Sequence, residues 1–281
     1  MSSGAESIDQ DDYAIEDENE LLMHNQNTLP KNCKKYWNKR YSLFSKFDEG
    51  IYMTAELWFS VTPEDIAIYT AQLVLEIMPE CRKVLDICCG GGGNTIQFAN
   101  YFPSVGSIDI NPSNMKCTLH NACVYGVEDR IWSKVGDWNQ FSLVLADGSP
   151  NQLWIPHHLR NAETPSAIFD FVFCSPPWGG PSYKDANGFD VYNMQPFPID
   201  QLCHQVMQYT QNFGLFLPRS TNLDQLRRLT TDIYGESGKC RIIFLNINGY
   251  CKGLLALFGP TVSADLVDCH SFLPEEQYSE Y

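Results

Sequence analysis

The chain has 281 residues, a net charge of −15 at neutral pH and 44% hydrophobic residues. This length and composition predict a globular protein of one domain with additions, or of two small domains. No apolar run approaches the roughly 20 residues that span a bilayer, and the first residues lack the basic and apolar regions of a secretory signal. The 11 cysteines are odd in number and contain no C-x-x-C pair, which argues against a disulfide scaffold and a structural zinc site.

The charges are unevenly distributed along the chain. Residues 1–30 contain eight acids and neither Lys nor Arg, which predicts a disordered acidic tail over residues 1–28. A basic stretch rich in aromatic residues follows and predicts a small helical extension over residues 29–62; its cations are Lys31, Lys34, Lys35, Lys39, Arg40 and Lys46. The main folded domain is expected over residues 63–265, with a C-terminal tail over 266–281.

The main domain shows an alternation of helices and strands. A helix is expected over 62–78, since Thr62 suits an N-cap and Pro63 a first helical position. Strands then alternate with helices, which predicts a mainly parallel α/β sheet. The last two strands are joined by Asn248-Gly249 and are expected to be antiparallel. The expected strands cover residues 83–89, 105–110, 131–137, 169–174, 213–218, 241–247 and 254–259, the helices 94–101, 112–125 and about 200–212, and the loop 138–168.

A glycine-rich turn follows the first strand. The sequence runs DICCGGGGN from Asp86 to Asn94, and Asp109 ends the next strand. Ligands of open α/β sheets bind beyond the carboxyl ends of the strands, where an acid in the position of Asp109 accepts bonds from ribose hydroxyls. Gly90 and Gly92 also fit a dinucleotide motif, but Thr95 replaces its third glycine and Asp86 would repel a pyrophosphate. The pattern therefore favours S-adenosylmethionine over NAD.

Two further positions carry weaker signals. Asp137 ends the third expected strand, where an acid can accept a bond from the adenine amino group, with Trp138 beside the ring. An ordinary solvated strand end explains Asp137 equally well.

The fourth expected strand is followed by Ser175-Pro176-Pro177-Trp178. The two prolines fix the backbone and leave carbonyl groups outside the strand ladder. A carbonyl and a polar side chain can then hold an exocyclic amine, while the aromatic residue stacks on the ring. Because the amine lone pair must face the methyl carbon in line with the departing sulfur, this motif suits methyl transfer to an amine on a planar base. A proline-rich surface turn is the alternative.

Five segments together resemble one family, trimethylguanosine synthase, of the RNA cap guanine-N2 methyltransferases. They are DICCGGGGNTIQ (86–97), SPPWGGPSY (175–183), FSVTPE (59–64), FLPR (216–219) and KYWNKRYSLFSKFDEG (35–50). The resemblance covers about residues 33–260 and is closest to fungal members. It implies a class I S-adenosylmethionine-dependent methyltransferase fold, with a seven-stranded sheet and an N-terminal helical extension. It also implies transfer of two methyl groups to N2 of a 7-methylguanosine cap, as on small nuclear and small nucleolar RNAs.

The resemblance assigns residues by matching position. For the cofactor it implies Asp86, Gly90, Asn94 and Asp109, with Ser60 and Thr62 closing over it. For the base it implies Trp178 as the stacking residue, Ser175, Pro176 and Asn121 around the edge, and Phe44 as a cover. Lys35, Tyr183 and Arg219 match positions that reach the cap phosphates. The departures are Cys88 in place of an aromatic residue, Ser182 in place of an acid, and the long stretch 138–168.

Two alternatives stay open on the residues alone. One is an amino-methyltransferase acting on adenine N6 or on an internal guanine, since such enzymes also use a polar-Pro-Pro-aromatic motif. The other is a cap-binding module without catalysis, against which the complete cofactor motif argues. A substrate of this kind predicts a protein of the nucleus and nucleolus, and the acidic tail suggests ribonucleoprotein partners with basic tails.

Overall fold

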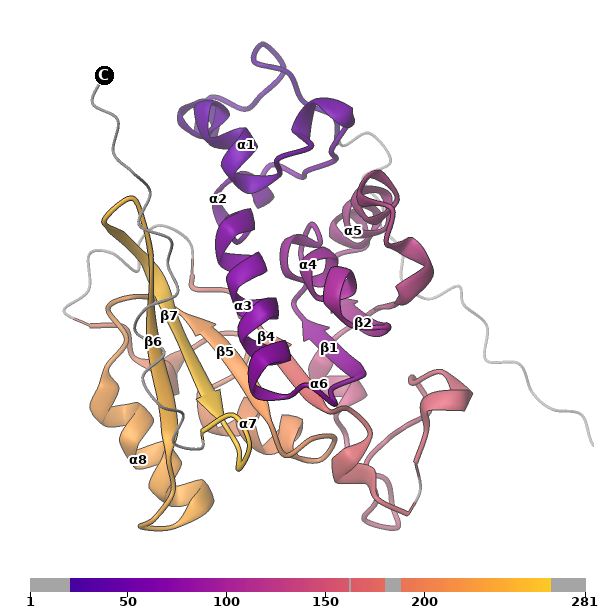
Figure 1. Ribbon diagram of the computed structural model, residues 1–281, viewed down its shortest axis with the longest axis vertical. Helices are drawn as coiled ribbons and strands as arrows, with labels where there is room; N and C mark the ends of the chain where they lie inside the picture. The colour runs from indigo at the N-terminus through magenta and orange to yellow at the C-terminus, as the bar shows by residue number, and fades with distance from the viewer. Residues whose placement is uncertain (1–20, 162, 180–187, 264–281) are drawn as a thin grey trace, which may run out of the picture. The chain divides into compact units, whose positions relative to one another are not determined.

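The computed structural model describes residues 21–161, 163–179 and 188–263. The chain divides into two compact units, one made of residues up to 71 together with 85–141, the other of residues 72–84 together with 142 onwards. Helix α3 (Glu64–Ile77) and strand β1 (Lys83–Ile87) belong partly to each. Figure 1 shows the course of the chain.

The extension at the start of the first unit is built from short helical turns around a cluster of aromatic rings. Trp37 stacks on Trp58 at 5.8 Å, and the ring of Phe47 meets Trp58 edge-on at 5.6 Å. Trp58 is almost fully buried, so these rings form a small core of their own. The turns are η1 (Lys34–Lys39), α1 (Arg40–Leu43), η2 (Phe47–Glu49) and α2 (Leu57–Ser60).

Part of the stretch predicted as tail is structured. The Leu22 carbonyl accepts a 2.8 Å hydrogen bond from the Met53 amide, and the Leu22 side chain is buried. Residues 21–28 therefore pack on the extension through the buried Leu22 side chain, an apolar contact that the acid content of the whole predicted tail (residues 1–28) conceals.

The rest of the first unit alternates strands and helices as predicted. Its elements after β1 are α4 (Gly93–Tyr101), β2 (Ser104–Asp109), α5 (Pro112–Tyr125), η3 (Glu128–Arg130), β3 (Ile131–Val135) and α6 (Trp138–Phe141). Strands β2 and β3 pair in parallel. Helix α5 begins at the expected Pro112 because the Asn111 side chain caps the Ser113 amide, and it ends at Gly126, whose left-handed φ of +71° suits glycine.

The second unit contains the remaining strands. Strands β4 (Phe171–Cys174) and β5 (Phe213–Leu217) are parallel, whereas β6 (Cys240–Ile247) and β7 (Tyr250–Phe258) form an antiparallel hairpin through Asn248-Gly249. Figure 1 shows helix α8 (Leu223–Tyr234) beside this hairpin. The remaining elements are η4 (His157–Leu159), η5 (Pro165–Ala167), η7 (Val191–Asn193) and α7 (Ile199–Met207).

The strand order is β3-β2-β1-β4-β5-β7-β6. A mainly parallel seven-stranded sheet with antiparallel last strands was the prediction, and it is confirmed. Every residue of β4 and β5 is buried, as is typical of central strands in α/β proteins. Two local expectations were wrong: helix α8 was not predicted, and the stretch expected as loop 138–168 contains α6 and buries Trp154 and Ile155.

Candidate functional site

The glycine turn after β1 adopts an unusual backbone conformation. Cys88, Gly90 and Gly92 all have φ in the left-handed region, at +62°, +57° and +85°. A Cβ atom on Gly90 or Gly91 would approach the Leu57 side chain to about 3 Å. The glycines therefore serve two purposes, since they permit this turn and let the extension pack closely on it.

Asp86, at the end of β1, has a carboxylate oxygen without a partner. The residue is fully buried; its Oδ2 accepts a 2.6 Å hydrogen bond from the Thr95 hydroxyl, while Oδ1 is buried and unpaired. Burial outweighs the bonds from Thr95 and raises the pKa of Asp86 to about 7. A buried acceptor without a donor is uncommon in native structures. A cationic donor such as the ammonium group of S-adenosylmethionine fits this oxygen.

Asp109, at the end of β2, holds the glycine turn in place. Its Oδ2 accepts a 2.8 Å hydrogen bond from the Gly90 amide, and its Oδ1 accepts from the Asn111 amide at 2.9 Å and the Asn114 side chain at 3.3 Å. Burial raises the pKa of Asp109 although these bonds oppose the effect. A carboxylate accepts about four hydrogen bonds, so one acceptor position remains for a ribose hydroxyl.

Glu56 is a residue that the sequence analysis missed. The Asn114 side chain donates to Glu56 Oε1 at 2.8 Å and also to Asp109, so one amide joins two carboxylates. Glu56 is exposed and lies immediately before α2. Asp109 has one acceptor position left for a ribose hydroxyl, and Glu56 can accept a hydrogen bond from the second ribose hydroxyl. Glu56 lies three residues before Phe59, where the FSVTPE segment begins, and the sequence gave no signal for its role because the contact depends on α5.

Asn94 and Thr62 join α4 to the extension. The Asn94 side-chain amide donates a 2.9 Å hydrogen bond to the Thr62 hydroxyl, and both residues are buried. Asn94 Oδ1 is buried without a partner, so a second unpaired acceptor lies near the amino end of α4. Ser60 is exposed and its hydroxyl donates to the Glu56 carbonyl at 2.9 Å. Of the two extension residues expected at the cofactor, Thr62 thus contacts the α4 end directly and Ser60 does not.

Asn121 and Phe44 are placed in the interior rather than at an open pocket. Asn121 is fully buried; its amide donates to the carbonyls of Tyr52 and Gly91, both at 2.9 Å, and its oxygen accepts from the Tyr52 amide at 2.8 Å. Asn121 thus uses both amide hydrogens and an oxygen lone pair for bonds within the protein. Phe44 is 2% exposed and packs against Tyr125 at 6.3 Å. In this structure both residues hold the extension on α5 and the glycine turn.

Asp137 lies beside Asp109 in the fold. The Gly136 amide donates to the Asp109 carbonyl at 2.9 Å, and the Asp137 carboxylate accepts from the Asn139 amide at the start of α6. The neighbouring Trp138 is 2% exposed, so its ring is part of the core. Lys35 is exposed in the extension, with its ammonium group 5.1 Å from the Tyr36 ring.

In the second unit, Ser175-Pro176-Pro177-Trp178 directly follows β4. Pro176 is buried, whereas Ser175 and Trp178 are half-buried. The indole nitrogen of Trp178 donates a 3.2 Å hydrogen bond to the Phe216 carbonyl in β5, and the two rings lie 5.2 Å apart. This bond fixes the orientation of an accessible indole. Arg219 is exposed two residues after β5, and Tyr183 lies outside the described residues.

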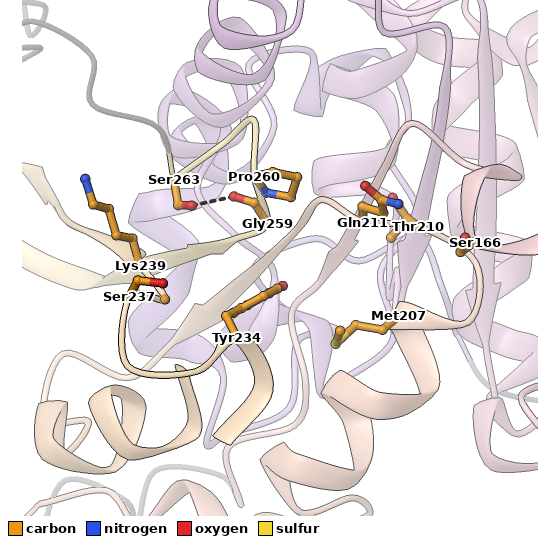
Figure 2. A pocket seen from close by; sticks show the side chains of 11 residues that line it. Ser166, Met207, Thr210, Gln211, Tyr234, Ser237, Lys239, Gly259, Pro260 and Ser263 are labelled. Carbon is orange, nitrogen blue, oxygen red and sulfur yellow. Dashed lines mark hydrogen bonds between the residues drawn. The ribbon is translucent and has the colours of Figure 1, made fainter. Parts of the chain in front are cut away.

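A cavity of about 590 Å³ lies elsewhere in the second unit (Figure 2). Its lining comes from segments before β4, β5 and β6 and from the segment after β7, among them Ser166, Thr210, Tyr234 and Pro260. These are the opposite strand ends from those that carry Trp178 and Arg219. The cavity therefore contains none of the predicted site residues and is separate from the motif after β4.

The described residues contain no cluster of three or more His, Cys, Asp or Glu side chains suited to a metal ion. Within the same part of the chain, no helix has the length and apolar character needed to cross a bilayer.

Comparison with known proteins agrees with these features. Residues 81–261 match the family model described as RNA cap guanine-N2 methyltransferase. The trimethylguanosine synthase of Saccharomyces cerevisiae is 40% identical over 80% of this chain and 67% of the relative, and that of Schizosaccharomyces pombe is 34% identical over 82% and 87%. Among solved structures, the human methyltransferase 10 domain containing protein is similar with a TM-score of 0.52 at 13% identity, covering 82% of this chain and 98% of its own. That last likeness concerns the fold.

Proposed function

The chain belongs to the RNA cap guanine-N2 methyltransferase family, and on this basis we propose that it converts the 7-methylguanosine cap of RNA to 2,2,7-trimethylguanosine. Two methyl groups pass from S-adenosylmethionine to the exocyclic N2 in two steps. The substrates are the capped precursors of small nuclear and small nucleolar RNAs. The observation that contributes most is the presence, in one chain, of the unpaired buried oxygen of Asp86 and an accessible indole oriented by Phe216.

The first unit supplies the cofactor residues. Asp86 Oδ1 pairs with the ammonium group. Burial raises the pKa of Asp86, and the bound cation opposes this effect because it stabilises the charged carboxylate. Asp109 and Glu56 share the ribose hydroxyls through the Asn114 bridge. When bound, S-adenosylmethionine supplies an electrophilic methyl group on a sulfonium. Thr62 and Asn94 keep the extension against the amino end of α4.

The second unit supplies the acceptor residues. The indole face of Trp178 attracts the delocalised positive charge of 7-methylguanine as well as stacking on it. Ser175 and the Pro176 carbonyl hold the exocyclic amine, which positions its lone pair for attack. Arg219, together with Lys35 and Tyr183, neutralises the cap phosphates. A strong general base is not needed, since the proton leaves after the nitrogen has become cationic.

Other acceptors are less consistent with these residues. Adenine N6 or an internal guanine carries no positive ring charge, so neither gains the cation–π attraction of Trp178. A cap-binding module without catalysis has no use for Asp86, whose buried oxygen lacks a partner at the cost of stability. We also infer a nuclear, including nucleolar, location and ribonucleoprotein partners with basic tails that meet the acids of residues 1–20.

Methyl transfer from labelled S-adenosylmethionine to 7-methylguanosine diphosphate tests the proposal. Label should appear on N2, as one and then two methyl groups, and guanosine diphosphate should be a poor acceptor. Transfer to RNA but not to the free nucleotide would instead support an internal base as the target. Tight nucleotide binding without any transfer would support the binding module.

A further inference from the structure

The exposed face of the extension carries cations that the protein itself does not use. Arg40 is committed internally, because it donates to the Trp37 carbonyl at 3.1 Å and to the Tyr41 hydroxyl at 2.9 Å. Lys46 is also committed, since it donates to the Val124 carbonyl at 3.1 Å and pairs with Glu49 at 3.6 Å.

The other four cations are different. Lys31, Lys34, Lys35 and Lys39 are exposed, and among the described residues no acid lies within ion-pair distance of any of them. No acid occurs in the sequence from residue 31 to 46. In a protein with a net charge of −15, an unneutralised basic surface indicates an anionic partner.

Two aromatic rings lie beside these lysines. Phe59 is 41% exposed and its ring lies 6.5 Å from that of Tyr36, which the Lys35 ammonium group approaches to 5.1 Å. Aromatic rings next to cations are the usual means of holding single-stranded nucleic acid, since bases stack on the rings and phosphates meet the cations. A purely acidic protein partner would not need the rings.

The position of Phe59 connects this surface to the cofactor end of the first unit. Its neighbour Leu57 faces inward against Gly90 and Gly91, and Val61 faces Gly91 and Gly93. Phe59 lies between them on the outer side of α2. An acceptor base must come close to a cofactor held at this turn, so the nucleotides that follow that base can reach Phe59.

We propose that this surface, formed by Lys31, Lys34, Lys39, Tyr36 and Phe59, binds the single-stranded RNA that follows the cap, next to Lys35, which is assigned to the cap phosphates. The inference rests on the proposed function for the identity of the RNA. It adds a second part to substrate recognition: the cap is bound at its own site, and the lysines and rings of the extension hold the nucleotides downstream.

The test compares one nucleotide with capped RNA. Lys34→Ala/Lys39→Ala and Phe59→Leu are measured with 7-methylguanosine diphosphate and with a capped, unstructured RNA of about 20 nucleotides, a length that spans one or two single-strand sites. Lys134→Ala, which removes an exposed lysine on β3, is the matched control. Thermal melts confirm that each variant folds.

The wild type should have a lower KM for the capped RNA than for the nucleotide at low salt, and this advantage should shrink as salt increases. The double lysine variant should lose most of that advantage, with a slope of log Kd against log salt smaller by about 1.4, because each lost phosphate contact removes about 0.7. Phe59→Leu should raise the Kd for RNA about fivefold or more with the slope unchanged. Neither should change the KM for the nucleotide.

Several results would overturn the inference. One is an unchanged KM for RNA in the lysine variant, and another is an equal loss with the nucleotide, which would assign these residues to the cap. If Lys134→Ala weakened RNA binding as much, the lysines would act only through the overall charge of the protein and not through a defined site. Binding of a synthetic peptide of residues 1–20 in place of RNA would make the surface a peptide site. If the wild type transfers no methyl group, the proposed function fails, while fluorescence anisotropy of the capped RNA still decides on this surface.

Discussion

Asp109 and Gly90 are joined by a 2.8 Å hydrogen bond from the Gly90 amide to the Asp109 carboxylate, which locks the glycine turn of one strand to the end of the next. The same carboxylate is expected to bind the cofactor ribose. Structure and binding thus depend on one side chain, and a variant of Asp109 must be tested for both.

Asp109→Asn should weaken binding of S-adenosylhomocysteine, because it removes the charge from the hydrogen bonds to ribose, at about 1.5–3 kcal/mol. Titration calorimetry measures the Kd, and a thermal melt reports the loss of the Gly90 bond. Glu56→Gln is the matched variant: it should weaken binding with little change in melting temperature, since Glu56 is exposed. An unchanged Kd in a folded Asp109→Asn protein would remove Asp109 from the site.

Asp86 should make both stability and cofactor binding depend on pH. Its pKa is about 7 in the folded chain against 3.8 for the free side chain, so the folded state binds the proton more strongly. The contribution of Asp86 to the free energy of unfolding is therefore fully present below about pH 4 and decreases as the pH rises towards 7.

Binding should change in the opposite direction, because the ionised carboxylate is the form that pairs with an ammonium group. The affinity for S-adenosylhomocysteine should rise about tenfold between pH 6 and pH 8. Asp86→Asn should bind weakly and without this dependence. Calorimetry at the two pH values decides, and a wild type whose affinity is equal at both would exclude an ion pair at Asp86.

The boundary of the acidic tail can be tested by deletion. Removal of residues 1–20 should leave the melting temperature and the activity on free cap nucleotide unchanged. Removal of residues 1–28 should lower stability by about 1.5–3 kcal/mol, because it also removes the buried Leu22 side chain. Equal melting temperatures for the two truncated proteins would show that Leu22 does not contribute to the fold.

Asn121 should behave as a structural residue. Asn121→Ala leaves the Tyr52 amide and the carbonyls of Tyr52 and Gly91 without their partner, which should cost about 3 kcal/mol or more. The melting temperature should fall, while the KM for 7-methylguanosine diphosphate, measured well below it, should stay within about twofold. A stable variant with a strongly raised KM would show that Asn121 contacts the edge of the base instead.

The sequence predicted the central strands well because their hydrophobic runs are continuous. Strand β4 and strand β5 are buried along their whole length, so period and burial agree. Helix α5 has the predicted bounds 112–125, and the structure explains them by local chemistry, with Asn111 as the N-cap and Gly126 as the C-cap. Helix α8 was missed although Asn222 caps it and its Leu226 and Leu229 are buried, since seven of its twelve residues are polar or charged.

The site was predictable only in part. Asp86 and Asp109 follow from their positions at strand ends. The roles of Glu56 and Asn121 do not, because each depends on a contact between segments 58 or more residues apart in the chain. The burial of Leu22 was not predicted, because the acids that precede it dominate the average composition of the segment.

The central claim is that Trp178 recognises the positive charge of a 7-methylated base, and kcat/KM for 7-methylguanosine diphosphate against guanosine diphosphate tests it most directly. The wild type should prefer the methylated nucleotide strongly. The preference should fall in Trp178→Phe and nearly vanish in Trp178→Ala, which loses about 2–4 kcal/mol of stacking and cation–π attraction. All three proteins should melt at similar temperatures, because the indole is half-exposed. An undiminished preference in a well-folded Trp178→Ala protein would contradict the account.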